Sequence, residues 1–478
     1  MPPIKFGTSG WRAIIADEFT LDNVKRVVAA IARYVLASSG SRRPSLVVGY
    51  DTRFLSEKFA ADAAAILAGY GIDCYLATGA VPTPTVAYEV LRRGTSGAIN
   101  FTASHNPPEY NGIKYSMPNG APALPEVTHE IEKQIEAGGQ APASGATAAI
   151  EKIDPHAAYL DALAHKVDLD VIREAGLRLV YDPLYGTGRG YLDGLLRDNG
   201  IGVFTIHDYR DVLFGGHPPE PAGEYMEPLK SAMRAMAGGA HLGLATDGDA
   251  DRFGILDEGG AFISPNHILA LLLDYLVESR TWLKKKKPND KGWQGGAARS
   301  VATTHLIDAV AAHHKIPVYE TPVGFKYIGE LIEQDKLLLG GEESAGLTIR
   351  HHVPEKDGIL ACLLAAEMVA ARRQPLARQL QDLFGKVGSY YPSRSNVTLS
   401  ESVKKRFTER IGEEYNSFDG RRVVKTVRTD GLKLILEDGS WILFRLSGTE
   451  PVCRLYTEAR TEKALEELTQ AARRFLFG

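Results

Sequence analysis

Short apolar segments alternate with helical segments along most of the chain, and this alternation restricts the possible folds more than any other feature. Residues 45–51, 74–79 and 96–104 have the length and composition of buried strands, and residues 58–71 and 86–93 have the apolar spacing of helices. Strands that alternate with helices form a mostly parallel sheet covered by helices. We therefore predict an α/β domain at the N-terminus.

The pattern returns twice, at intervals of roughly one hundred residues, and then changes. After residues 392–396 the chain has the pattern of an antiparallel sheet, with tight turns at Asp430-Gly431 and Asp438-Gly439, and a closing helix at 461–476. This predicts three similar α/β units followed by a smaller α+β domain. The domain boundaries that we expect are 1–150, 151–257, 258–388 and 389–478.

The charge balance argues against a nucleic-acid partner. The chain has 55 lysines and arginines, 59 aspartates and glutamates, and a net charge of −4, so no overall positive field attracts nucleic acid. The basic run 284–287 precedes Pro288 and Asn289, which is typical of a solvated loop.

Cysteine usage and hydropathy favour a cytoplasmic protein. Cys74, Cys362 and Cys453 are far apart and form no CxxC pair, which disfavours a disulfide scaffold or a zinc cluster. The first residues lack the pattern of a signal peptide. The best apolar runs, 268–277 and 359–371, contain charged residues and are too short to cross a membrane, so we expect no membrane partner.

The segment TDGDADR, residues 246–252, places Asp247, Asp249 and Asp251 at alternate positions. In an extended segment this spacing puts all three carboxylates on one side, where they repel one another unless a cation lies among them. Oxygen ligands suit Mg²⁺ or Ca²⁺. A calcium-binding loop is the alternative, because Glu258 falls at its twelfth position; however, Arg252 stands where such a loop needs glycine, and both flanks have the pattern of strands. The segment therefore predicts a magnesium site.

Two loops have the composition of a phosphate-binding turn. GTSGWR, residues 7–12, supplies small hydroxyls and Arg12, but an ordinary turn would have the same composition. RLSGTEP, residues 445–451, combines exposed N–H groups with hydroxyls and a guanidinium, which suits a phosphate, and a simple hairpin turn is the alternative. Its candidate residues are Arg445, Ser447, Gly448 and Thr449.

Two other segments carry candidate reactive or sugar-binding groups. GGEESAG, residues 340–346, supplies Glu342 and Ser344, which suit vicinal sugar hydroxyls; a helix N-terminus that favours acidic residues is the alternative. TASHNP, residues 102–107, places Ser104 beside His105. Adjacent residues of an extended chain point to opposite faces, so we expect no direct hydrogen bond between them. Without a GxSxG turn a hydrolase triad is disfavoured, and a capping serine is the alternative to a functional one.

Together, TASHNP, DGDADR, GEES and RLSGTEP resemble, in type and order, the four signature loops of the α-D-phosphohexomutase superfamily, which includes phosphoglucomutases and phosphomannomutases. The resemblance covers nearly the whole chain. It implies an α/β fold of four domains around a central cleft: three similar mixed-sheet α/β units and a smaller α+β C-terminal domain.

The resemblance also implies roles for individual residues. Ser104 would carry a phosphoryl group and would hold Mg²⁺ together with Asp247, Asp249 and Asp251. Catalytic roles also fall to Arg12 and Lys114, the latter as an acid–base group if neighbouring positive charge lowers its pKa. Lys326 comes from TPVGFKYI and Lys356 from EKDG. The substrate-binding residues that the resemblance implies are His105, Lys326, Glu342, Ser344, Lys356, Arg445, Ser447, Gly448 and Thr449.

The function implied by this family is the interconversion of hexose 1-phosphate and hexose 6-phosphate through a phosphoserine and a hexose 1,6-bisphosphate, which also serves as activator. GEES together with EKDG favours glucose, while mannose stays open. A hexose 1,6-bisphosphate synthase, which refills the serine from a second phosphorylated donor, is one alternative, and a silent sugar-phosphate sensor is another. Partners would be small sugar phosphates, and both a monomer and a dimer are compatible with the sequence.

Overall fold

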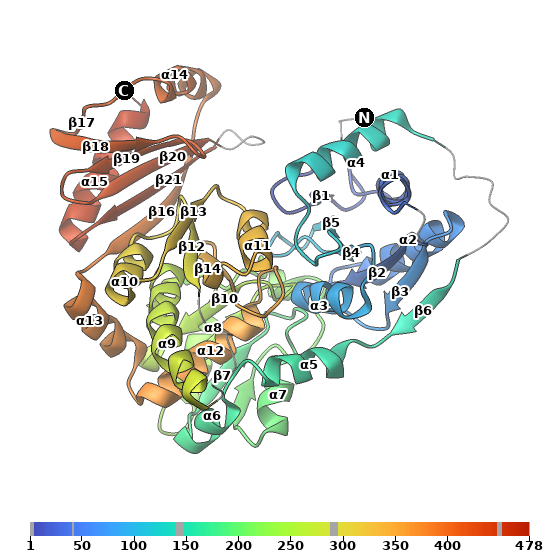
Figure 1. Ribbon diagram of the computed structural model, residues 1–478, viewed down its shortest axis with the longest axis horizontal. Helices are drawn as coiled ribbons and strands as arrows, with labels where there is room; N and C mark the ends of the chain where they lie inside the picture. Colours follow the sequence, from blue (N-terminus) through green and yellow to red (C-terminus); the bar gives the residue numbers. More distant parts are fainter. Residues whose placement is uncertain (1–3, 41–42, 140–147, 287–294, 447–451, 478) are drawn as a thin grey trace.

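The computed structural model describes residues 4–40, 43–139, 148–286, 295–446 and 452–477, and each of its four domains is built on one sheet (Figure 1). The first domain, in blue and cyan, lies at one side of the molecule and the fourth, in red, at the other, with the second and third between them. The predicted fold class, three mixed-sheet α/β units and an α+β C-terminal domain, is confirmed.

The first domain has a six-stranded sheet in the order β1-β5-β4-β2-β3-β6, in which β4, β2, β3 and β6 are parallel and β5 is antiparallel to both of its neighbours. Helices α1, α2 and α4 cover one face, and α3 covers the other. The strands are β1 (Trp11–Ile14), β2 (Ser45–Tyr50), β3 (Asp73–Ala77), β4 (Ala98–Phe101), β5 (Tyr110–Ser116) and β6 (Ile150–Ile153). The helices are α1 (Leu21–Ser38), α2 (Ser56–Gly69), α3 (Thr83–Arg93) and α4 (Pro125–Ala137).

The second domain has a five-stranded sheet in the order β11-β10-β9-β7-β8, with α8 on one face. Its strands are β7 (Leu179–Asp182), β8 (Val203–Thr205), β9 (Leu242–Thr246), β10 (Phe253–Leu256) and β11 (Phe262–Ile263). Its helices are α5 (His156–Ala164), α6 (Leu169–Ala175), α7 (Leu192–Asp198), α8 (Glu227–Ala235) and the short 3₁₀ turns η1 (Phe214–Gly216) and η2 (Glu258–Gly260).

The third domain has a four-stranded sheet in the order β13-β12-β14-β15. Its strands are β12 (Gly296–Ser300), β13 (Val318–Thr321), β14 (Leu337–Glu342) and β15 (Gly346–Ile349), and its helices are α9 (Pro265–Lys286), α10 (Leu306–His314), α11 (Phe325–Glu333), α12 (Gly358–Arg372) and α13 (Leu376–Val387). Helix α12 is apolar on nearly all sides and packs against elements of both the second and third domains. These two domains therefore share one large core.

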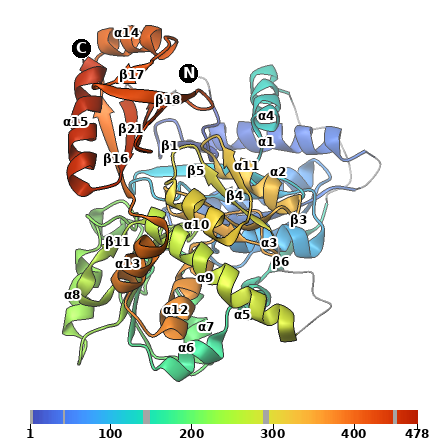
Figure 2. The ribbon, with the colours of Figure 1, turned by 60° about the vertical axis from the view of Figure 1, so that its left-hand side comes forward.

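The fourth domain is an antiparallel sheet in the order β16-β21-β20-β19-β18-β17, and the turns predicted at Asp430-Gly431 and Asp438-Gly439 connect its strands. Helices α14 and α15 cover the outer face (Figure 2), while Trp441 and Tyr456 on the other face pack against Val301 of the third domain. The elements are β16 (Tyr391–Thr398), β17 (Ser417–Phe418), β18 (Arg421–Val427), β19 (Leu432–Leu436), β20 (Trp441–Leu446), β21 (Val452–Ala459), α14 (Glu401–Ile411) and α15 (Glu462–Phe477).

The three α/β sheets repeat one local arrangement at the edge that bears function. In each, a parallel strand (β4, β9 or β14) is followed by an antiparallel neighbour (β5, β10 or β15), and the hairpin between them holds predicted site residues. The carboxyl ends of parallel strands are where open α/β sheets place ligands. No helix among the described residues is both long and apolar enough to cross a membrane.

Candidate active site

A cavity of about 500 Å³ lies where the four domains meet. Lysine and arginine side chains outnumber carboxylates on its walls, so the cavity suits a small anion. Its predicted site residues are Arg12, Ser104, His105, Asp251, Lys326, Glu342, Ser344 and Lys356.

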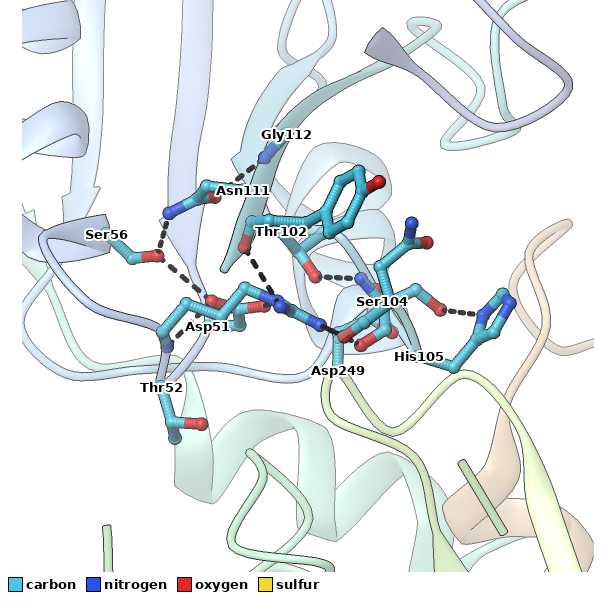
Figure 3. Close-up of polar contacts among 12 residues, drawn as sticks. Asp51, Thr52, Ser56, Thr102, Ser104, His105, Asn111, Gly112 and Asp249 are labelled. Atoms are coloured by element: carbon cyan, nitrogen blue, oxygen red, sulfur yellow. Dashed lines mark hydrogen bonds and ion pairs between the residues drawn. The ribbon is translucent and has the colours of Figure 1, made fainter. Parts of the chain in front are cut away.

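Ser104 lies in the loop after β4, in the left-handed backbone conformation with φ of 52°. Its N–H donates to Thr102 Oγ1 at 2.8 Å, and its own hydroxyl donates to Asp247 Oδ2 at 2.7 Å. The Ser104 Oγ also lies 3.4 Å from His105 Nδ1 (Figure 3). Our expectation that neighbouring side chains would point apart is therefore wrong, because the left-handed residue ends the extended chain and turns both side chains to one side.

The three aspartates lie in the tight hairpin between β9 and β10, and not in an extended segment as predicted. Ala250 has a φ of 56° and turns the chain within the hairpin. The turn nevertheless gathers oxygens of Asp247, Asp249 and Asp251 within 4.8 Å of one another. The grouping of the carboxylates was thus predicted correctly, although the backbone that produces it was not.

The donor set fits a hard divalent cation. Asp249 Oδ1 and Asp251 Oδ1 are buried and accept no hydrogen bond from the residues that the structure describes. Unsatisfied buried carboxylate oxygens are costly unless a cation or a donor reaches them, and oxygen-only ligands suit Mg²⁺. Both flanks of the loop are strands, as predicted, which is unlike the paired helices of an EF-hand.

The buried charges in this cluster balance one another unevenly. Burial, followed by repulsion from Asp251 and Asp249, raises the pKa of Asp247 well above its usual range. Lys114 Nζ lies 2.6 Å from Asp249 Oδ2 and 2.8 Å from Asp251 Oδ2. Burial disfavours the charged amine, but these two carboxylates outweigh burial and raise the pKa of Lys114. This is opposite to the lowering that we expected from neighbouring positive charge.

Arg12 and Lys356 bring further positive charge to the cavity. Arg12, on β1, donates to Asn106 Oδ1 at 2.7 Å, and burial is the main cause that lowers its pKa to about 10. Lys356 Nζ lies 3.3 Å from Asp251 Oδ2 and 2.8 Å from Glu355 Oε1. The lysine predicted to contact phosphate is therefore adjacent to the acidic cluster.

Glu342 ends β14, and Ser344 lies in the hairpin before β15, so the alternative of a helix N-terminus is wrong. The Glu342 Oε1 accepts a 2.7 Å hydrogen bond from the N–H of Gly324. Burial, and then repulsion from Glu343, raise the pKa of Glu342 to about 7. Lys326 is half-buried on the same side of the cavity.

The fourth domain contributes residues that the sequence patterns did not identify. Arg394 on β16, and Arg454 and Tyr456 on β21, line the cavity. Arg445 lies on β20 and donates from Nε to Asp430 Oδ2 at 2.8 Å, and it does not line the cavity. The other predicted phosphate-binding residues, Ser447, Gly448 and Thr449, lie outside the described residues.

Arg252 is another lining residue that was not predicted, although it belongs to the DGDADR motif and its position there was the available signal. Its N–H donates to Asp247 Oδ1 at 3.0 Å. For Arg394 and Arg454 the only signal was their place in neighbouring antiparallel strands, which requires the pairing of β16 with β21.

Comparisons with known proteins agree with this geometry. Residues 3–142, 157–260 and 264–387 match the phosphoglucomutase/phosphomannomutase alpha/beta/alpha domains I, II and III, and residues 394–474 match the C-terminal domain of the same family.

Individual relatives span the full chain. A phosphoglucomutase/phosphomannomutase of Thermococcus kodakarensis is 29% identical over 97% of this chain and 96% of its own length. The "Probable phosphoglucosamine mutase" of Methanothermobacter thermautotrophicus is 31% identical over 99% and 98%. A crystal structure from Thermus thermophilus, described as a phosphomannomutase, has a TM-score of 0.84 at 32% identity and covers 100% of this chain and 99% of its own. The chain therefore belongs to the phosphoglucomutase/phosphomannomutase family of phosphohexomutases, isomerases that transfer a phosphoryl group within a sugar phosphate.

Proposed function

We propose that this protein interconverts hexose 1-phosphate and hexose 6-phosphate, with glucose as the preferred hexose, and that Ser104 carries the phosphoryl group. One observation carries the proposal: the Ser104 hydroxyl, bound to Asp247 at 2.7 Å, faces a cavity rich in lysine and arginine. A nucleophilic oxygen beside a cation site and an anion-binding wall are what phosphoryl transfer requires.

In the first half of the reaction, the bond from Ser104 Oγ to phosphorus breaks as the 6-hydroxyl of a hexose 1-phosphate forms a new bond to phosphorus. The hydroxyl loses a proton and Ser104 Oγ regains one, so the proton count is unchanged. We assign this proton exchange to Lys114 and the binding of the transferring phosphoryl oxygens to Arg12. The bisphosphate then reorients, and Ser104 takes the phosphoryl group from the 1-position.

Asp247, Asp249 and Asp251, with an oxygen of phosphorylated Ser104, would hold Mg²⁺. The ion, when bound, would neutralise charge on the phosphoryl oxygens and in the transition state. Among the residues of this chain, Asp247 also holds the Ser104 hydroxyl in place for transfer.

The two ends of the sugar need separate binding sites. Glu342 and Ser344 would accept and donate hydrogen bonds to sugar hydroxyls, and His105, Lys326 and Lys356 would contact the substrate around them. Arg394, Arg454 and the loop that contains Arg445, Ser447, Gly448 and Thr449 would hold the phosphate that does not react. One such anion site serves both orientations of the bisphosphate.

The test is an assay of the purified protein with Mg²⁺ on the 1-phosphates of glucose, mannose and glucosamine, with and without trace hexose 1,6-bisphosphate. We expect glucose 1-phosphate to react fastest, activation by the bisphosphate, and one phosphoryl group on Ser104 by intact mass. Ser104→Ala should fold and lose turnover, whereas Ser38→Ala, in an exposed position on α1, should behave as the parent.

Parent-level activity in Ser104→Ala would overturn the phosphoserine assignment. Net accumulation of hexose 1,6-bisphosphate from a second donor would identify a synthase instead of a mutase. Preference for mannose or glucosamine 1-phosphate would correct the sugar assignment and leave the transfer chemistry intact.

A further inference from the structure

A second arginine lies directly behind the Ser104 loop, on the side away from the cavity. Arg53 follows β2, the parallel neighbour of β4, so the turn after β2 lies beside the loop after β4. Its side chain has no exposed surface, and a buried guanidinium is costly unless its donors are satisfied. The arrangement around Arg53 therefore needs a reason.

All five N–H donors of the Arg53 guanidinium are bound. Nε donates to Asp51 Oδ2 at 3.1 Å. Nη1 donates to the carbonyls of Pro107 and Tyr110 at 2.7 and 2.9 Å, and Nη2 donates to those of Ser104 and Asn106 at 2.8 and 2.6 Å. A guanidinium has five donors in a fixed plane, so four of them fix the positions of four backbone oxygens in the loop.

The carboxylate that orients Arg53 is itself held in place. Asp51 Oδ1 accepts from the Arg53 backbone N–H and from Ser56 Oγ, both at 3.0 Å. Asn111 donates to Ser56 Oγ at 2.9 Å and so connects this cluster to the start of β5 (Figure 3). Phe214 of the second domain covers the guanidinium, with 5.0 Å between the Arg53 Cζ and the ring centroid. The cluster is closed to water and has one geometry.

Ser104 needs such support because its backbone is strained. A non-glycine residue in the left-handed region is unfavourable, and it persists only where its surroundings impose it. The carbonyl of Ser104 is fixed by Arg53 and its N–H by Thr102 Oγ1, so both peptide groups of the residue are restrained. The Asn106 carbonyl bound by Arg53 belongs to the residue whose side chain receives Arg12.

We propose that Arg53, assisted by Thr102, is a positioning residue for phosphoryl transfer: it imposes the left-handed conformation on Ser104, and thereby aims the hydroxyl at Asp247 and places Arg12 beside it. The inference rests on the proposed function of Ser104 as phosphoryl carrier. Arg53 contacts neither cavity nor substrate, so its effect reaches the chemical step only through the loop.

The experiment uses the full-length protein with Mg²⁺ and glucose 1-phosphate, and compares the parent with Arg53→Lys and Thr102→Val. Lysine keeps the charge but has three donors at one point and cannot hold four oxygens. Valine keeps the shape of Thr102 and removes the acceptor for the Ser104 N–H. The matched control is Arg210→Lys, because Arg210 donates to the backbone of Thr52 and Arg53 but not to the Ser104 loop.

We expect kcat to fall roughly 10- to 100-fold in Arg53→Lys and Thr102→Val, since small misplacement of reacting groups has effects of this size. KM should stay within about threefold of the parent, because binding residues are elsewhere. The ³¹P resonance of the phosphoserine should move from its position in the folded parent toward that of the denatured protein. Arg210→Lys should keep the parent kcat and resonance.

A folded Arg53→Lys with the parent kcat and resonance would overturn the proposal, as would a rise in KM with unchanged kcat. If Arg53→Lys does not fold, Thr102→Val decides by the same criteria. A parent protein that never carries phosphate on Ser104 and has no mutase activity would overturn the proposed function, and this inference with it; a phosphorylated, active parent with insensitive variants would overturn this inference alone.

Discussion

Asp249 has two oxygens in different situations. Its Oδ2 is bound by Lys114 and Thr83, whereas its Oδ1 accepts no hydrogen bond from the described residues. We expect Asp249→Asn to lower kcat by more than about 100-fold, because even residues behind metal ligands typically contribute 10- to 100-fold, and to change KM little. EDTA should abolish parent activity and added Mg²⁺ should restore it in steady-state assays.

The control is Asp161→Asn, whose side chain is largely exposed on α5, and it should keep the parent kcat and response to EDTA. Full activity of metal-free parent enzyme would remove the aspartate loop from the mechanism.

Glu342 should make both substrate binding and stability depend on pH. Burial and Glu343 raise its folded pKa to about 7 from a usual value of 4.5, so the folded chain keeps a proton that the unfolded chain has lost between these values. The free energy of unfolding therefore falls as pH rises through this window. Glu342→Gln removes this loss, so its Tm relative to the parent should be higher at pH 8 than at pH 5.

Ionised Glu342 accepts sugar hydroxyls better than the protonated acid, so kcat/KM of the parent should rise between about pH 6 and 8. The same rise in Glu342→Gln would show that another group controls substrate binding.

At the residue scale, motifs identified the groups that carry chemistry but not those that hold them. Asp247, Asp249, Asp251 and Ser104 share short segments, so their spacing was visible. The contact between Arg53 and four carbonyls was not visible, since it depends on parallel pairing of β2 with β4 and on a positive φ at a residue that local sequence would not place there.

Among the elements, the hairpin between β18 and β19 connects the fourth domain to the third. Asp430 Oδ2 accepts from the N–H of Val323 at 3.2 Å and from Arg445 Nε at 2.8 Å. Val323 lines the cavity. We expect Arg445→Ala to raise KM about 10-fold or more with a smaller change in kcat, because a charge-assisted hydrogen bond contributes about 1.5–3 kcal/mol and a phosphate that does not react is bound equally in ground and transition states.

Steady-state kinetics of Arg445→Ala, with Asp430→Asn as a second variant and Arg474→Ala, largely exposed on α15, as control, would measure this. An unchanged KM would mean that Arg445 only holds the hairpin through Asp430.

Element types followed from periodicity, but partners did not. The alternating pattern of β19 places Lys433 opposite Leu432 and Leu434, which predicts a solvent-facing lysine. The structure buries it completely, because that face of the sheet packs on the third domain. Packing between domains is a long-range contact that no local pattern contains.

At the scale of the whole molecule, Lys433 makes the junction of the third and fourth domains sensitive to pH. Its Nζ donates to Val301 O at 2.6 Å, lies 2.9 Å from His305 Nε2, and lies 3.9 Å from the centroid of Trp441. Burial, and then Arg299, lower its pKa to about 7. The Trp441 ring favours the cation by about 0.5–2 kcal/mol, which is less than the effect of full burial.

The unfolded chain therefore binds a proton at Lys433 that the folded chain lacks between about pH 7 and its usual pKa of 10.5. The free energy of unfolding should rise with pH across this window because of this residue. In denaturant titrations at pH 6.5, 8 and 9.5, Lys433→Met should lose this rise, and Lys425→Met, exposed on the same sheet, should keep it. Equal slopes in all three proteins would show that Lys433 stays charged.

The cavity walls run from Gly7 to Tyr456, so the chemistry is distributed over nearly the whole length of the chain. A chain emerging from the ribosome would expose Ser104 and the aspartate loop long before Arg394 and Arg454 exist. Any product cut short before the last sheet would contain the reactive serine without the wall that selects its substrate. Completing the sequence, and not only folding its first half, is what makes this enzyme an isomerase.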